Sequence, residues 1–215
     1  MIKAVCFDMD GVVTDTEKLH YLSWRDSFEA ENVPLSTEVY KNNLQSISHE
    51  KGIRRIIPAA TDNQISRMSK NKRASYDQLI ANDIDVFDDT LSLIKLLQKR
   101  CIRMAVVSSS SYAEMIIDKV GLTDYFEFVI GGTKGMSIKN KPHPDIYLEA
   151  IKRLKLESKE VLVVEDSING MNAGLSAGCN VLGVNRFGFD VVATEQLMVC
   201  NAIDSSKVVR KYFGD

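Results

Sequence analysis

Two aspartates follow directly after an apolar segment near the start of the chain. The stretch Phe7-Asp8-Met9-Asp10-Gly11 places the carboxyl groups of Asp8 and Asp10 where a buried strand would meet solvent. Like charges at close range raise the pKa of one of the carboxyls, and a bound cation reverses that effect. The stretch therefore predicts a site that holds a cation or keeps one carboxyl protonated. A plain Asp-Gly turn is the alternative explanation of Asp10 and Gly11.

A second pair of acids, Glu165 and Asp166, follows another apolar run. Asp166 could simply cap the helix expected to begin at Ser167, but a cap needs one acid rather than two. Asp8, Asp10 and Asp166 would together offer only oxygen ligands, which suit Mg²⁺ better than zinc or copper. We therefore expect a Mg²⁺ site built from both acidic pairs.

A hydroxyl group and an ammonium group stand at matching positions. Ser108 follows the apolar run 102–107, and Lys141 lies in a loop just before a helical pattern. Each could be an ordinary loop residue, since Lys141 is one of 27 basic residues. However, a serine hydroxyl, a lysine ammonium and Mg²⁺ complement the nonbridging oxygens of a phosphoryl group. The combination indicates phosphoryl chemistry.

Alternating strand and helix patterns would position these groups. Short runs rich in Val and Ile occur at residues 2–7, 102–107, 128–130, 161–164 and 181–184, and helical patterns at about 89–100, 112–120, 144–155 and 167–177. This alternation predicts an α/β fold with a Rossmann-like, doubly wound parallel sheet. Such sheets bind ligands at the carboxyl ends of their strands, where both acidic pairs and Ser108 are expected.

Residues 16–82 break this alternation, because apolar side chains recur there only at helical spacing, as Trp24 and Phe28 do. We expect a core of residues 1–14 and 87–215 with a small α-helical cap domain, 15–86, inserted after the first strand. Residues 41–73 hold eight lysines or arginines against two acids. A solvated helix face would explain this excess, and so would attraction of an anionic substrate.

The composition excludes several classes of partner. A net charge of -2 over 215 residues provides no overall attraction for nucleic acid or an anionic membrane. No apolar run is long enough to span a membrane, and we expect no secretory signal, because the first residues lead directly into an apolar strand. Four dispersed cysteines without a Cys-x-x-Cys pair indicate reduced thiols. We expect a cytoplasmic protein, a monomer or weak homo-oligomer, with a small phosphorylated substrate and neither nucleic-acid nor membrane partners.

Four motifs in this order resemble those of the haloacid dehalogenase superfamily. They are Asp8-Met9-Asp10-Gly11-Val12-Val13-Thr14-Asp15, Val106-Val107-Ser108, Lys141-Pro142 and Glu165-Asp166-Ser167. The resemblance spans nearly the whole chain, and the helical insert looks like the cap of the superfamily's β-phosphoglucomutases and sugar-phosphate phosphatases. Dehalogenases and phosphonatases of the superfamily lack an acid at the position of Asp10, so the resemblance implies a phosphotransfer enzyme.

The resemblance also implies a role for each motif residue. Asp8 would be the nucleophile that becomes an aspartyl phosphate, and Asp10 the general acid and base. Mg²⁺ would be held by Asp8, Asp166 and the backbone carbonyl of Asp10, with Glu165 close by. The implied phosphate-binding residues are Ser108, Ser109, Lys141 and Gly11.

Cap residues are expected to select the substrate. The β-phosphoglucomutases carry a cap Arg and a cap Lys that bind the second phosphate of the sugar. An ungapped comparison places them on His49 and Gln78, so both are replaced here. His20 and Trp24 match the mutase-like pattern, although a surface and a core position of one helix would explain them equally well. The candidate cap residues are Thr16, His20, Trp24, His49 and Gln78.

The function expected from these residues is that of a Mg²⁺-dependent phosphatase, a phosphoric monoester hydrolase acting on a sugar phosphate or another small phosphorylated metabolite through an aspartyl phosphate. The alternative is a β-phosphoglucomutase, which interconverts β-glucose 1-phosphate and glucose 6-phosphate through the same intermediate. A phospho-accepting signalling module is a remote alternative, since receiver domains also combine acids, a hydroxyl and a lysine on a parallel sheet. Receiver domains are much shorter and lack a helical insert.

Overall fold

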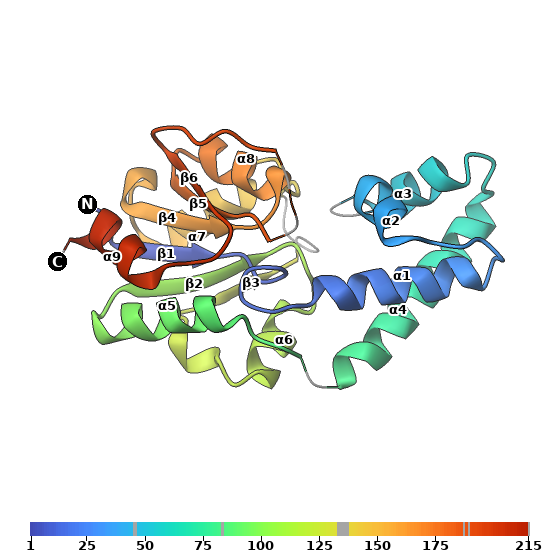
Figure 1. The fold of residues 1–215 in the computed structure, drawn as a ribbon, viewed down its shortest axis with the longest axis horizontal. Helices are drawn as coiled ribbons and strands as arrows, with labels where there is room; N and C mark the ends of the chain where they lie inside the picture. Colours follow the sequence, from blue (N-terminus) through green and yellow to red (C-terminus); the bar gives the residue numbers. More distant parts are fainter. Residues whose placement is uncertain (45–46, 83, 133–137, 187, 189, 215) are drawn as a thin grey trace. The chain divides into compact units, whose positions relative to one another are not determined.

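The computed structural model describes residues 1–44, 47–82, 84–132, 138–186, 188 and 190–214. It divides into two compact units (Figure 1). The core unit comprises Met1–Asp15 and Asp85–Asp215, and the cap unit comprises Thr16–Ile84. Among the described residues, no helix combines the length and the apolar character needed to cross a membrane.

The core unit contains one parallel sheet of six strands in the order β3-β2-β1-β4-β5-β6. Its strands are β1 Ala4–Phe7, β2 Arg103–Ser108, β3 Val129–Gly131, β4 Val161–Glu165, β5 Asn180–Val184 and β6 Leu197–Cys200. The central strands β1 and β4 are buried at every position, which explains their unbroken apolar runs. The predicted α/β fold with a doubly wound parallel sheet is confirmed.

The order of the strands reverses between β1 and β4. The chain proceeds from β1 to β2 and β3 on one side, and from β4 to β5 and β6 on the other. Phe7 pairs with Val164, so Asp8, the residue after β1, and Glu165, the last residue of β4, lie beside each other. Ligands of doubly wound sheets bind at such a reversal, next to the carboxyl ends of the strands. The fold therefore brings the two acidic pairs to one point.

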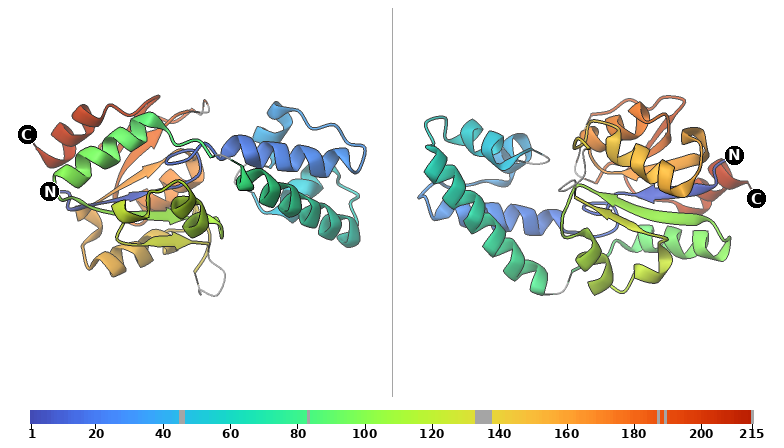
Figure 2. Two further views of the ribbon diagram at one scale, coloured as in Figure 1. Left: turned by 90° about the horizontal axis from the view of Figure 1, so that it is seen from below. Right: turned by 180° about the vertical axis from the view of Figure 1, so that it is seen from behind.

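Helices cover both faces of this sheet. They are α5 Asp88–Lys99, α6 Ala113–Lys119, α7 Asp145–Leu154, α8 Ile168–Ser176 and α9 Ser205–Phe213, with short 3₁₀ helices η1 Thr123–Tyr125 and η2 Ser158–Glu160. Helices α7 and α8 bury apolar side chains against strand residues such as Cys6 and Val163. Helices α5 and α9 lie side by side on the face opposite α7 (Figure 2).

The cap unit is helical, as predicted. Its helices are α1 Glu17–Glu29, α2 Thr37–Asn43, α3 His49–Ile56 and α4 Asp62–Ala81, and α1 packs along α4. Phe28, Ile53 and Met68 are fully buried in a small apolar core of their own. The hydroxyl of Thr61 caps α4 by accepting a hydrogen bond from the backbone N–H of Gln64.

Candidate active site

Lys141 joins the two acidic strand ends. Its Nζ atom donates to Asp8 Oδ1 at 2.6 Å, to Glu165 Oε1 at 2.7 Å and to the carbonyl of Val107 at 3.1 Å. Burial alone would lower the pKa of Lys141, but the charges of Asp8 and Glu165 raise it above its ordinary value. Lys141 therefore remains a cation in a buried setting.

The pKa of Asp8 is also raised, which in an acid favours the neutral form. Burial raises its pKa most strongly; Lys141 lowers it, and Glu165 and Asp10 raise it further, so that the pKa of Asp8 reaches about 8. One carboxylate oxygen from each of Asp8, Glu165 and Asp166 lies within 4.8 Å of the others. Three buried carboxyls beside one ammonium form an oxygen-only donor set with a deficit of positive charge. This set fits Mg²⁺.

Glu165 is fully buried and held by four donors. Its Oε1 atom accepts from Lys141 Nζ and from Tyr147 Oη, both at 2.7 Å. Its Oε2 atom accepts from the backbone N–H of Asp166 and the hydroxyl of Ser167, both at 3.2 Å. The Ser167 hydroxyl also caps α8 by accepting from the N–H of Gly170 at 3.0 Å. Glu165 therefore fixes Lys141 as well as contributing negative charge.

Tyr147 is a site residue that the sequence interpretation did not single out. Its side chain is fully buried in α7, and burial, followed by the charge of Glu165, raises its pKa well above the ordinary value. The hydroxyl therefore stays a donor to Glu165. Tyr147 falls on the apolar face of α7, where an aromatic residue is typical of an ordinary core position, so this contact could not be predicted from the sequence.

The loop after β1 places Asp10 and Gly11. The hydroxyl of Ser108 lies 3.4 Å from Asp10 Oδ2 and accepts from the backbone N–H of Ser110 at 3.0 Å. Gly11 has φ of 78°, a conformation that side chains disfavour. The structure thus brings Asp10 and Ser108 together at the ends of β1 and β2. Ser109, the next predicted phosphate-binding residue, is exposed in the loop after β2.

In the cap unit, His20 and Trp24 have different surroundings. The ring of His20 stacks on Tyr76 with centroids 4.4 Å apart, and its Nδ1 atom lies 3.0 Å from Lys72 Nζ. Trp24 belongs to the apolar core of the cap unit, and its ring contacts that of His49 edge-on, with the ring centroids 4.8 Å apart.

Burial lowers the pKa of His49 to about 4, and the charges of Lys72, Arg73 and His20 act in the same direction. The imidazole is therefore neutral near pH 7. Thr16 is buried just before α1, and its carbonyl accepts from the N–H of His20 at 3.0 Å. Gln78 lies exposed on α4.

Lys72 was also missed by the sequence interpretation. Its side chain is only 6% exposed, and its ammonium lies 4.3 Å from the ring centroid of Tyr76. The buried residues of α4 are Ile65, Met68, Lys72, Tyr76 and Ile80, which recur at helical spacing. A lysine at a position where the helical pattern expects an apolar residue could have drawn attention to Lys72.

The comparisons with known proteins agree with this arrangement. Residues 5–184 match the haloacid dehalogenase-like hydrolase family, and the chain belongs to that family. The predicted family and its β-phosphoglucomutase-like subfamily are confirmed, and the protein is an enzyme, either a phosphatase or a phosphoglucomutase.

Several relatives resemble most of the chain. The β-phosphoglucomutase of Bacillus subtilis (strain 168) is 29% identical over 206 residues, which cover 90% of either chain. A phosphorylated carbohydrates phosphatase of Thermotoga maritima is 27% identical over 185 residues, or 82% of either chain. The crystal structure of a β-phosphoglucomutase from Clostridium difficile superposes with a TM-score of 0.80 at 27% identity, and the match covers 99% of this chain and 97% of that one.

Proposed function

We propose that the protein is a Mg²⁺-dependent phosphatase that hydrolyses a sugar phosphate or a similar small phosphorylated metabolite through an aspartyl phosphate at Asp8. The observation that carries this proposal is the position of the Asp8 carboxylate. It lies where the strand order reverses, 2.6 Å from Lys141 Nζ and within the cluster of Glu165 and Asp166. The Thermotoga maritima relative, named for its action on phosphorylated carbohydrates, supports the substrate class.

The residues proposed to hold Mg²⁺ are Asp8, Asp166 and the backbone carbonyl of Asp10, with Glu165 beside them. When bound, the ion supplies positive charge that favours the ionised form of Asp8 and neutralises phosphoryl oxygens. This assignment agrees with the all-oxygen donor set and with the raised pKa of Asp8.

The chain's own residues divide the remaining work. The Asp8 carboxylate attacks phosphorus while the bond to the leaving oxygen breaks, and Asp10 gives that oxygen its proton. Lys141 and Ser108 bind nonbridging oxygens of the phosphoryl group. Asp10 then takes a proton from water as the water oxygen attacks phosphorus, which releases inorganic phosphate and restores Asp8.

A β-phosphoglucomutase is the second candidate, because the Bacillus subtilis relative covers more of the chain than the phosphatase does. A mutase must grip a second phosphate on its sugar. In the ungapped comparison, His49 stands where mutases have a cap arginine, and its lowered pKa leaves it without charge near pH 7. This loss of a cation favours the phosphatase, although Lys72 remains as a buried cation of the cap unit.

Phosphate release from a panel of phosphorylated metabolites, with Mg²⁺ or with EDTA, tests the proposal. We expect Mg²⁺-dependent release that Asp8→Asn abolishes, because the amide is not a nucleophile. The matched control Asp124→Asn alters an exposed acid outside the cluster and should leave activity unchanged. Isomerisation of β-glucose 1-phosphate without phosphate release would establish the mutase instead, and a stable phosphoprotein without turnover would establish the signalling module.

A further inference from the structure

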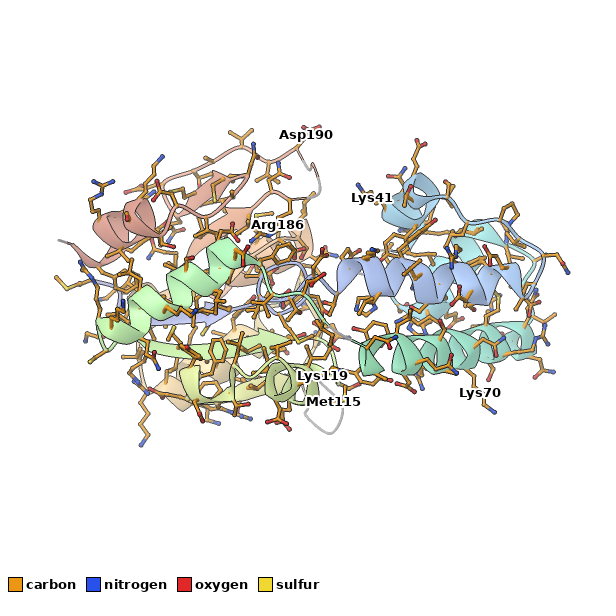
Figure 3. All side chains as sticks on the ribbon, turned by 60° about the horizontal axis from the view of Figure 1, so that its bottom comes forward. Lys41, Lys70, Met115, Lys119, Arg186 and Asp190 are labelled. Atoms are coloured by element: carbon orange, nitrogen blue, oxygen red, sulfur yellow. The ribbon has the colours of Figure 1, made fainter. Side chains whose placement is uncertain are left out.

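Arg186 follows β5 and donates hydrogen bonds to two parts of the core unit. Its side chain is 12% exposed, and its Nε atom donates to the carbonyl of Gly11 at 3.1 Å. Gly11 directly follows Asp10, so this hydrogen bond ties Arg186 to the loop after β1. Figure 3 shows Arg186 beside the first turn of α5, where its other partners lie.

The guanidinium of Arg186 is anchored on Asp89. Its Nη1 and Nη2 atoms donate to the two carboxylate oxygens of Asp89 at 3.1 and 2.7 Å, and Nη2 also donates to the hydroxyl of Thr90 at 3.1 Å. The guanidinium carbon of Arg186 lies 3.9 Å from the ring centroid of Phe87, which is a cation–π contact. The backbone N–H of Ile203 donates to Asp89 Oδ2 at 2.7 Å and fixes the carboxylate in turn. Such a bidentate pair gives one defined orientation to Arg186.

The loop that Arg186 reaches is held through its backbone carbonyls. The carbonyl of Met9 accepts from the N–H groups of the three residues 12–14. The carbonyl of Val12 accepts from the Thr90 hydroxyl at 2.7 Å, and that of Val13 accepts from the N–H of Phe87 at 3.1 Å. Arg186 supplies the corresponding bond for the carbonyl of Gly11. The N–H of Gly11 donates within the loop, to the carbonyl of Thr14 at 2.9 Å, whereas its carbonyl is bonded from outside the loop by Arg186.

The carboxyl group of Asp10 depends on this backbone. Its Oδ2 atom lies 3.4 Å from the Ser108 hydroxyl, and the whole side chain moves with the backbone to which it is attached. A general acid must lie within hydrogen-bond reach of the leaving oxygen, and misplacement by about 1 Å can cost on the order of a hundredfold in rate.

We propose that Arg186 is a positioning residue for Asp10, acting through its hydrogen bond to the carbonyl of Gly11. This inference rests on the proposed phosphatase function, in which Asp10 protonates the leaving oxygen. A lysine could keep the charge at this position but could not grip both oxygens of Asp89 and the Gly11 carbonyl at once. The orientation of the guanidinium, and not only its charge, is what places the loop.

The dependence of rate on the leaving group separates positioning of Asp10 from general damage. The value of kcat/KM would be measured for an alkyl phosphate, whose leaving oxygen needs a proton, and for p-nitrophenyl phosphate, whose leaving group departs without one. We expect Arg186→Gln to lower kcat/KM for the alkyl phosphate by about tenfold to a hundredfold and for p-nitrophenyl phosphate much less. Arg186→Lys should fall between the native enzyme and Arg186→Gln.

The matched control is Arg103→Gln. Arg103 makes the same kinds of contact: two of its nitrogens donate to the carboxylate of Glu127, and the third donates to the backbone carbonyl of Leu154. However, Arg103 lies at the start of β2. We expect this variant to keep the native ratio between the two substrates. A loss of the same factor on both substrates in Arg186→Gln would overturn the inference, because it would indicate fewer active molecules rather than a misplaced acid.

Amide hydrogen exchange gives a second readout that needs no substrate. The N–H groups of residues 12–14 donate to Met9 within the loop, so we expect them to exchange faster in Arg186→Gln than in the native protein or in Arg103→Gln. Unchanged exchange would overturn the inference even if the enzyme releases phosphate. If the native protein released no phosphate from any substrate, the proposed function would fail, and the exchange rates would still decide whether Arg186 holds this loop.

Discussion

Asp8 belongs to a buried group of acids whose negative charge exceeds the positive charge beside it. Its carboxyl, Glu165 and Asp166 form a group of three acids, and Lys141 contributes one positive charge to it. Burial strengthens both the attraction to Lys141 and the repulsion between the acids, because the interior screens charge less than water does. A divalent cation bound at this group would offset the excess of negative charge.

His49 provides a prediction about pH at the same scale. The pKa of His49 is about 4 in the folded protein, against 6.5 for an unperturbed histidine, because burial and neighbouring cations disfavour the charged ring. The unfolded chain therefore takes up a proton below about pH 6.5 that the folded protein refuses until about pH 4. The contribution of His49 to the free energy of unfolding is present above pH 6.5 and is lost as the pH falls through this window.

Urea denaturation of the native protein and of His49→Gln between pH 7 and pH 4 measures this contribution. The variant should lose less free energy of unfolding than the native protein as the pH decreases, since glutamine does not titrate. Equal losses in the two proteins would contradict the pKa assigned to His49.

Individual motif residues could be predicted from the sequence, but their long-range partners could not. Asp8, Ser108 and Glu165 each follow an apolar run, and parallel strands bring such positions to one edge. Arg186 and Gly11 are separated by 175 residues, and no periodicity links a loop after β5 to one after β1. Lys141 was predicted to bind phosphate, but its hydrogen bond to Glu165 could be seen only in the structure.

At the scale of elements, the start of helix α8 is built around a side chain of strand β4. A Cβ atom added to Gly170 would lie 1.9 Å from the carboxyl carbon of Glu165. The absence of a side chain at this point lets the first turn of α8 cover Glu165 while Ser167 caps the helix. This glycine therefore serves the active site rather than the flexibility of the helix.

Gly170→Ala tests this role. Alanine should favour the helix by about 1 kcal/mol, but the Glu165 carboxylate must move away from Lys141 and Tyr147 and lose buried hydrogen bonds. We expect a net decrease of about 2 to 4 kcal/mol in the free energy of unfolding, together with loss of phosphate release. Asn172→Ala, at an exposed position of the same helix, is the control and should be neutral or stabilising. Full activity in Gly170→Ala would contradict the account of Glu165.

Several buried strands could be predicted from their apolar runs, whereas two short elements near the C-terminal end, β6 and α9, were missed. The strands β1, β2 and β4 have long apolar runs because both faces are covered. The edge strand β6 is an apolar run of only four residues, Leu197–Cys200, and so short a run does not by itself distinguish a strand from another buried segment. The helix α9 has nine residues, fewer than three helical turns, and buries only Val208 and Val209.

At the scale of the whole molecule, the chain combines a core unit that carries the phosphoryl chemistry with a helical cap unit. Family membership covers residues 5–184, and relatives of both kinds, a phosphatase and a phosphoglucomutase, match most of the chain. The four motifs and all of the sheet except β6 and the first residue of β1 lie within the residues that match the family. The cap unit, with His49 neutral and Lys72 buried, is where the chain can differ from its mutase relatives.

The central claim is that Asp8 carries the phosphoryl group during turnover. Rapid acid quenching of the Asp10→Asn variant after mixing with p-nitrophenyl phosphate and Mg²⁺, followed by mass spectrometry of its peptides, tests this claim most directly. Because this leaving group departs without a proton and Asp10 is proposed to activate the water, the variant should form the intermediate but hydrolyse it slowly, and the peptide containing Asp8 should gain one phosphoryl group that Asp8→Asn never acquires. Phosphate release by the native enzyme with the phosphoryl group on another residue, or on none, would contradict the account.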